Sequence, residues 1–245
     1  MANFDPVRQG YFKFKGVSSN DMKVYMLGLP TRPVPAEKGE KKSVEGRDGD
    51  LWISEHAYKR ITVKCKLECA ADADIDAINA WLSGAGDLVF MDEPNRCYKA
   101  RCIADIPRDH SSPRRLNRNW NQQFDCEPFR YEAEPAEDFV FTETAQIIHN
   151  PSSIEALPFI TMNVTGNATL MIGGVNTIMV TDYTGIIHID CDAKIAYTGE
   201  GTAASPRILL NHKCSGEFPV IPSGYNGVMF TGASSVTIKP RWRWI

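Results

Sequence analysis

The second half of this chain lacks apolar residues at helical spacing, and this absence constrains its fold more than any other feature. Beyond Glu132 the sequence passes through an acidic, proline-interrupted stretch, EAEPAEDFVFTETAQ, and then through a series of short β-rich runs. The runs are FITMNVTG, ATLMIGG, VNTIMVTD, GIIHIDCD, AKIAYT, GVMFTG and SVTIKPRW. Gly, Asn and Asp punctuate them at a spacing typical of an antiparallel sandwich. We therefore expect a β-sandwich in this half.

The first half combines strands with one helix. The run ITVKCKLEC, which begins at Ile61, alternates apolar and polar residues and is typical of a half-buried strand. The run DADIDAINAWLSGAG places apolar residues at helical spacing between Asp72, the expected N-cap, and a stop at Gly84. The segments LVFMDEP, CYKARCIADIP and NWNQQFDCEPF indicate further strands, with an exposed hairpin tip between the last two.

Length and charge narrow the class of protein. A chain of 245 residues exceeds the commonest domain size, so we expect two domains, 1–137 and 138–245, with the boundary where the composition shifts. A net charge of -3 indicates no general affinity for nucleic acid. The apolar runs fall short of the ~20 residues that cross a bilayer, and the N-terminal stretch has no apolar signal core. We expect a protein that is made and kept in the cytosol, without membrane insertion.

Sequence motifs of catalysis and of cofactor or metal binding are missing. GxSxG, HExxH and GxxxxGK[ST] do not occur, and the odd number of cysteines, 7, shows no CxxC spacing. Cys65 and Cys69 lie on the apolar phase of their strand as small hydrophobic residues. GEGTAA at Gly199 leads into a proline and an apolar run where a dinucleotide site needs a helix, and we interpret His188 and Asp190 in HIDCD as satisfied strand residues. We expect no enzyme, no cofactor and no metal.

The stretch SVEGRDGDLW holds Arg47 and Asp48 between Gly46 and Gly49. A phosphate loop would lead into a helix, and an EF-hand loop would need Asp or Asn where Trp52 stands. Neither condition is met, so the stretch is predicted to be a turn between the strands KKSVEG and DLWIS. Because glycine permits positive φ at both ends, the backbone would fix the direction of the charged tip.

Segments in both halves closely resemble the distal tail proteins of bacteriophages with long, non-contractile tails. In the first half they are FKFKGVSSNDMKVYML, EKKSVEGRDGDL, IDAINAWLSGAGDLVFMDEPNRCYKARC and FDCEPFRY. In the second half they are NPSSIEALPFITMNVTGNATLMIGG, IHIDCD, GEFPVIPSGYNGVMFTG and VTIKPRWR. The resemblance covers nearly the whole chain, and the GRDG turn, WLSGAGDLVFMDEP and FPVIPSGYNGV are its most specific motifs.

The resemblance implies a structural protein of the phage tail tip with a mainly β fold. An N-terminal β-sandwich with one α-helix and a protruding β-hairpin would be followed by a C-terminal galectin-like or carbohydrate-module-like β-sandwich. N-terminal domains would form a hexameric ring that joins the tail tube protein to the tail-associated lysin, tail fibre or receptor-binding protein. DNA would only pass through the channel. The protein would reside in the virion after synthesis in the cytoplasm of the bacterial host.

The expected assembly residues lie in the GRDG turn and in the hairpin whose tip is near Ser111 to Arg118. They are Gly46, Arg47, Asp48, Gly49, Arg114, Arg115 and Arg118. The alternative function is a carbohydrate-binding module that contributes directly to host recognition, with Tyr183 and Tyr225 stacking on sugar. Because the aromatic residues of the second half are dispersed, and because Trp242 and Trp244 are expected in its core, we favour an attachment module without sugar affinity.

Overall fold

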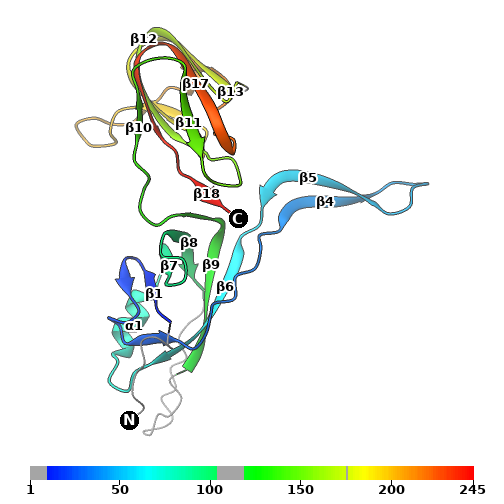
Figure 1. Ribbon diagram of the computed structural model, residues 1–245, viewed down its shortest axis with the longest axis vertical. Helices are drawn as coiled ribbons and strands as arrows, with labels where there is room; N and C mark the ends of the chain where they lie inside the picture. The colour runs from blue at the N-terminus through cyan, green and yellow to red at the C-terminus, as the bar shows by residue number, and fades with distance from the viewer. Residues whose placement is uncertain (1–9, 104–118, 175) are drawn as a thin grey trace. The chain divides into compact units, whose positions relative to one another are not determined.

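The computed structural model describes residues 10–103, 119–174 and 176–245 and divides the chain into two compact units. The first unit is Met1–Ala133 together with Ile245, and the second is Glu134–Trp244. Antiparallel strands dominate both units, and the described residues contain one α-helix, so the predicted mainly β fold class is confirmed (Figure 1). This helix, within the part of the chain that the structure describes, is too short to cross a membrane.

A curled antiparallel sheet organises the first unit, with the strand order β2-β1-β7-β8-β9-β6-β3. Its strands are β1 (Phe12–Phe14), β2 (Val17–Ser18), β3 (Val24–Met26), β6 (Ile61–Cys69), β7 (Ala85–Phe90), β8 (Arg96–Cys102) and β9 (Asn119–Glu132). The curl brings the ends of this order together, because the Met26 N–H on β3 donates to the Gly10 carbonyl, just before β1, at 2.9 Å. The expected strand from Ile61 is confirmed, and its alternate residues are buried.

Helix α1 (Ile75–Trp81) follows β6, and its N-cap differs from the predicted one. The cap is Asp74, whose carboxylate accepts hydrogen bonds from the backbone N–H groups of the first turn, including that of Ala77 at 3.2 Å. Asp72, the predicted cap, forms an ion pair with Lys23 instead. The prediction was wrong because both aspartates precede the helix, and only the backbone path decides which carboxylate faces the free N–H groups.

The core of the first unit lies between this helix and the curled sheet. Trp81 at the end of the helix stacks on Phe12 at a ring-centroid distance of 5.4 Å, and its Nε1–H donates to the Phe14 carbonyl at 2.9 Å. Phe124 on β9 contacts both phenylalanine rings from the neighbouring part of the sheet. The helix is therefore held by aromatic packing together with one hydrogen bond to β1.

Three long strands build the second unit: β12 (Phe159–Ile172), β13 (Asn176–Asp190) and β17 (Gly224–Lys239). One half of this three-stranded sheet also carries β11 (Gln146–Asn150) and β16 (Cys214–Gly216). The other half carries β10 (Phe139–Phe141), β14 (Ile195–Thr198) and β15 (Ile208–Leu209). The 3-10 helix Asn211–Lys213 and β18 (Arg243–Trp244) complete the chain. Buried residues of both halves belong to one core, so the two halves are the layers of a sandwich.

Each long strand was expected as two separate runs, and the structure corrects this. The register shifts between Gly166 and Ala168, where the Asp182 N–H donates to Asn167 Oδ1 at 2.9 Å and satisfies the bulged backbone. On β17, Gly232 has a φ of 70°, and a Cβ at this position would lie 1.8 Å from the Asn167 carbonyl oxygen. Glycines that the sequence pattern indicated as turns therefore lie at β-bulges. The strands continue through these bulges.

Both tryptophans of the C-terminal PRWRWI pack in the second unit, as predicted. Trp242 is buried in the core of the second unit, and Trp244 packs against it. Arg241 forms an ion pair with Asp190, and Arg243 forms one with Glu155. The tryptophans therefore contribute to the core and do not form an exposed platform.

Candidate assembly surface

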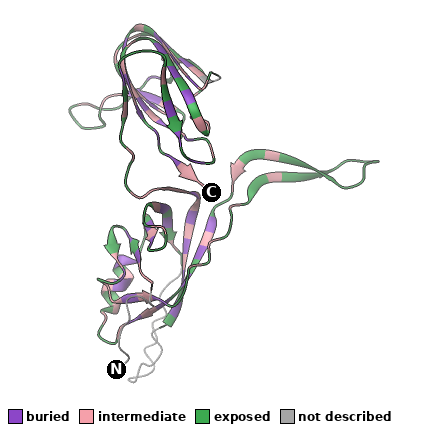
Figure 2. Ribbon diagram, in the orientation of Figure 1, coloured by how far each residue is buried: buried purple, intermediate pink, exposed green. Residues whose placement is uncertain are grey.

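Strands β4 (Glu37–Ser43) and β5 (Asp50–Tyr58) form a hairpin that belongs to neither of the larger sheets. The hairpin extends away from the core of the first unit, and none of the residues in its two strands is buried (Figures 1 and 2). An isolated two-stranded hairpin is marginally stable in water. A contact with another surface would therefore add much to its stability.

The GRDG turn forms the tip of this hairpin, as the sequence predicts. Gly46 and Gly49 have φ values of 79° and 77°, and a Cβ at either position would meet no atom within 4 Å. The positive φ therefore requires glycine at these two positions, since a side chain would have enough space there. Arg47 and Asp48 lie exposed between them, and neither forms an ion pair with any residue that the structure describes. The other predicted tip, near Ser111 to Arg118 with Arg114 and Arg115, lies outside the described residues.

Both faces of the hairpin carry exposed apolar side chains, since Leu51, Trp52 and Ile53 are consecutive residues of β5. Trp52 is 46% exposed, and its indole lies so close to Gly39 that a Cβ there would be 2.7 Å from the ring. Val44, Leu51 and Ile53 are also exposed. Apolar groups that cluster on a narrow arm are typical of a protein contact surface.

The base of the hairpin is attached to the curled sheet. The ring of Tyr58 meets that of Phe129 on β9 edge-to-face at 5.4 Å, and the Lys59 N–H donates to the Ala36 carbonyl at 2.8 Å. Arg60 then leads into β6. The arm therefore starts from a packed base, while its tip lies in solvent.

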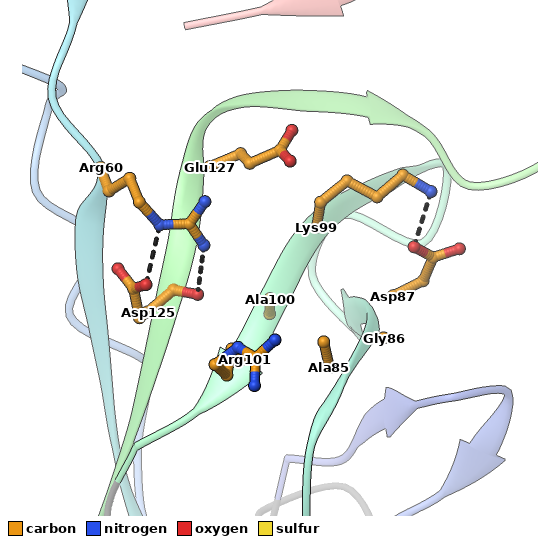
Figure 3. A pocket seen from close by; sticks show the side chains of 9 residues that line it. All are labelled: Arg60, Ala85, Gly86, Asp87, Lys99, Ala100, Arg101, Asp125 and Glu127. Carbon is orange, nitrogen blue, oxygen red and sulfur yellow. Dashed lines mark hydrogen bonds and ion pairs between the residues drawn. The ribbon is translucent and has the colours of Figure 1, made fainter.

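A hollow with a volume of about 430 Å³ lies over β7, β8 and β9 and the start of β6. Figure 3 shows small residues, Ala85, Gly86 and Ala100, surrounded by charged side chains. The charged residues are Arg60, Asp87, Lys99, Arg101, Asp125 and Glu127. Three cations and three anions balance one another, so the pocket is strongly polar without a formal net charge.

Two ion pairs inside the pocket are complete. Arg60 Nε donates to Asp125 Oδ2 at 2.7 Å, and Lys99 Nζ lies 2.7 Å from Asp87 Oδ1. Burial opposes the charge on Lys99, but the hydrogen bond to Asp87 and the charge of this carboxylate outweigh it and raise the pKa of Lys99. These four side chains therefore satisfy one another.

The other two charged side chains of the pocket lack ion-pair partners among the residues that the structure describes. Arg101 on β8 is exposed. Glu127 on β9 accepts a hydrogen bond from the Tyr131 hydroxyl at 2.9 Å, and its carboxylate forms no ion pair with a described residue. Sequence reasoning missed this pocket, although the alternation in CYKARC places Lys99 and Arg101 on one face of a strand.

The thiols and the HIDCD segment are positioned for structural roles. The cysteines form no disulfide among the residues that the structure describes, and burial raises the pKa of Cys65, Cys126 and Cys191 to about 12. These thiols are therefore neutral and inert at physiological pH. In the residues that the structure describes, no group of three or more His, Cys, Asp and Glu could hold a metal ion.

His188 and Asp190 do not form a catalytic pair. His188 Nδ1 lies 3.0 Å from Thr161 Oγ1, and Asp190 accepts two hydrogen bonds from Arg241, at 2.8 and 3.1 Å. Burial, reinforced by the charge of Arg207, lowers the pKa of His188. Both residues have their own partners, in agreement with their interpretation as satisfied strand residues.

The candidate sugar-binding tyrosines occupy different parts of the second unit. The Tyr183 hydroxyl donates to the Ile186 carbonyl at 2.8 Å, and its ring packs against the core. Tyr225, at the start of β17, is 80% exposed and contacts the ring of His149 at 4.4 Å. The structure does not bring the two tyrosines together, so no shared stacking platform results.

Comparisons with known proteins identify the fold. No protein-family model and no curated protein matches the sequence. The structure is similar to the crystal structure of the SPP1 Dit (gp 19.1) protein, described as a paradigm of the hub adsorption apparatus in phages that infect Gram-positive bacteria. The TM-score is 0.69, with 15% sequence identity, over 96% of this chain and 99% of the other. The mainly β fold expected from the resemblance to distal tail proteins is therefore confirmed.

Proposed function

We propose that this chain is a structural protein of a phage tail tip, in which the first unit forms a hexameric ring and the second is a peripheral attachment module. The exposed β4–β5 hairpin is the observation that carries this proposal, since an arm of this kind is suited to holding a neighbouring subunit. The likeness to SPP1 Dit over nearly the whole chain supports the tail-tip role.

A ring is the assembly that such an arm favours. An arm that docks at a different place on the next copy makes a head-to-tail contact, and repeated head-to-tail contacts close into a ring when the rotation permits. About 800 Å² of buried surface per partner is enough for a stable interface. The exposed apolar side chains of the hairpin, such as Trp52 and Ile53, would supply part of this area.

The ring would join the tail tube protein on one face to the tail-associated lysin, tail fibre or receptor-binding protein on the other. DNA would touch the protein only in transit through the channel. The chain would be made in the cytoplasm of the bacterial host and would end in the virion, without membrane insertion, cofactor or enzymatic activity. The balanced charge of the chain is compatible with passage of DNA without retention.

Analytical ultracentrifugation with negative-stain imaging tests the ring. We expect ring particles with a central channel at high protein concentration. A matched variant in which a short Gly-Ser linker replaces residues 38–57 should keep the circular dichroism spectrum of a β protein but remain monomeric. A wild-type chain that sediments only as a monomer would contradict the proposal.

A carbohydrate-binding module remains the second candidate, and the exposure of Tyr225 is the observation that favours it. A sugar site needs several aromatic and polar groups that converge on one surface, whereas Tyr183 is engaged elsewhere. We therefore expect no saturable binding to a glycan array. Specific binding that Tyr225→Ala abolishes, and that Tyr183→Phe leaves intact, would establish direct host recognition in place of a pure attachment role.

A further inference from the structure

We infer that the charged tip of the β4–β5 hairpin docks in the charged pocket of a second copy of this chain, with Asp48 paired to Arg101 and Arg47 paired to Glu127. This inference rests on the proposed ring and specifies its contact. Both surfaces belong to the first unit.

The tip offers two adjacent charges of opposite sign in a fixed direction. Arg47 and Asp48 are exposed, and positive φ at Gly46 and Gly49 defines the turn that presents them. Neither side chain has an ion-pair partner within the described part of its own chain. A partner that presents the two opposite charges in matching order would pair with both side chains and fix the register of the contact.

The pocket offers the complementary pair. Arg101 and Glu127 are the charged side chains of the pocket that form no ion pair with a described residue, since Arg60 is engaged by Asp125 and Lys99 by Asp87. A guanidinium forms its strongest hydrogen bonds with a carboxylate in a two-pronged arrangement. Ala85 and the backbone at Gly86 and Ala100 line the pocket between these charged side chains (Figure 3).

The tip cannot readily fill the pocket of its own chain. Arg60, which lines the pocket, follows the last residue of β5, Tyr58, almost directly, so the pocket adjoins the base of the hairpin. The nine residues of β5, at about 3.3 Å each, place the tip about 30 Å from that base. An arm and a receptor separated in this way produce a head-to-tail contact between copies.

Charge reversal followed by mixing tests the pairing. Asp48→Lys and Arg101→Glu should each weaken self-association about tenfold or more, because each places like charges together. An equimolar mixture of the two variants should assemble again, since each tip then meets a complementary pocket in an alternating ring. The same-chain double variant D48K/R101E should also recover.

Control variants separate this contact from a general effect of charge. Asp21→Lys before β3 and Lys13→Glu on β1 reverse exposed charges outside the hairpin and the pocket, and they should leave assembly unchanged. Single variants that assemble like the wild type, or a mixture that does not recover, would refute the inference while the ring stands. A wild-type chain that remains monomeric would contradict both the ring and this contact.

Discussion

The two β-hairpins β4–β5 and β12–β13 have the same secondary structure but opposite environments. Alternate residues of β12 are buried in the core of the second unit, whereas no residue of β4 is buried in the first (Figure 2). The β12–β13 hairpin is stabilised by its own chain, through side chains such as Leu170. The β4–β5 hairpin lacks this source of stability and would obtain it from a partner. The contrast separates residues that maintain the fold from residues that are free to serve assembly.

Truncation of the β12 core should have the largest effect. Leu170 is fully buried, so Leu170→Ala should lower the free energy of unfolding of the second unit by about 2 to 5 kcal/mol through lost burial and a cavity. Urea denaturation monitored by tryptophan fluorescence would measure this. The matched change Ile53→Ala in the exposed hairpin should alter stability by no more than about 0.5 kcal/mol. Equal losses for the two variants would contradict the comparison.

Strain in the GRDG turn should have an intermediate effect that stays local. Gly46→Val forces a β-branched residue to a φ of 79°, at a cost of about 1 to 3 kcal/mol. Because the hairpin has no buried residues, we expect this cost to appear as faster hydrogen exchange of the β4 and β5 amides, with little change in global unfolding. Gly46→Asn is the control, since Asn tolerates left-handed backbone. A large loss of global stability would show that the hairpin belongs to the core of its unit.

Acid should weaken one surface pair of the second unit. Burial alone would raise the pKa of Asp190, but the hydrogen bond from Arg241 outweighs it and lowers this pKa below its ordinary value of 3.8. A lowered pKa in the folded state means that the stabilisation is complete above the unfolded value and is lost as the pH falls through the folded value. The difference in melting temperature between wild type and Arg241→Ala should therefore shrink below about pH 4. If the difference in melting temperature stays constant down to the lowest pH at which the protein folds, the stabilisation comes from the contact of Arg241 with the Phe159 ring.

The smallest effect on stability is expected at the hairpin tip. Arg47 is exposed and unpaired in the described structure, so Arg47→Ala should change the free energy of unfolding of the monomer by less than about 0.5 kcal/mol. The same variant should weaken assembly, measured by sedimentation velocity. Arg47→Lys keeps the charge but loses the planar donor, and it should fall between wild type and alanine. A marked drop in melting temperature for the monomer would contradict this division of roles.

Sequence patterns predicted the elements whose signal is local. The alternation from Ile61 identified β6, because burial on one face of a strand repeats every second residue. The helix was also correct, although its N-cap moved from Asp72 to Asp74. The GRDG turn followed from the backbone freedom of glycine, which depends on no distant contact.

Features that depend on distant residues were not predictable. Gly166 and Gly232 read as ends of strands, but bulges carry β12 and β17 through them because partner strands satisfy the backbone there. The charged pocket also depends on residues that are distant in the sequence, because the register of the sheet brings its strands together. Single side chains such as Arg101 gave no sign that they would line a pocket together with Glu127.

The continuous strands of the second unit also determine how it responds to mechanical force. Because β12, β13 and β17 pass through both layers, the layers are linked by peptide bonds as well as by side-chain packing. A pull on one layer is therefore transmitted to the other along the backbone, and the layers cannot slide apart without disrupting the ladders of all three strands. The second unit would therefore resist separation of its layers under load through this connectivity.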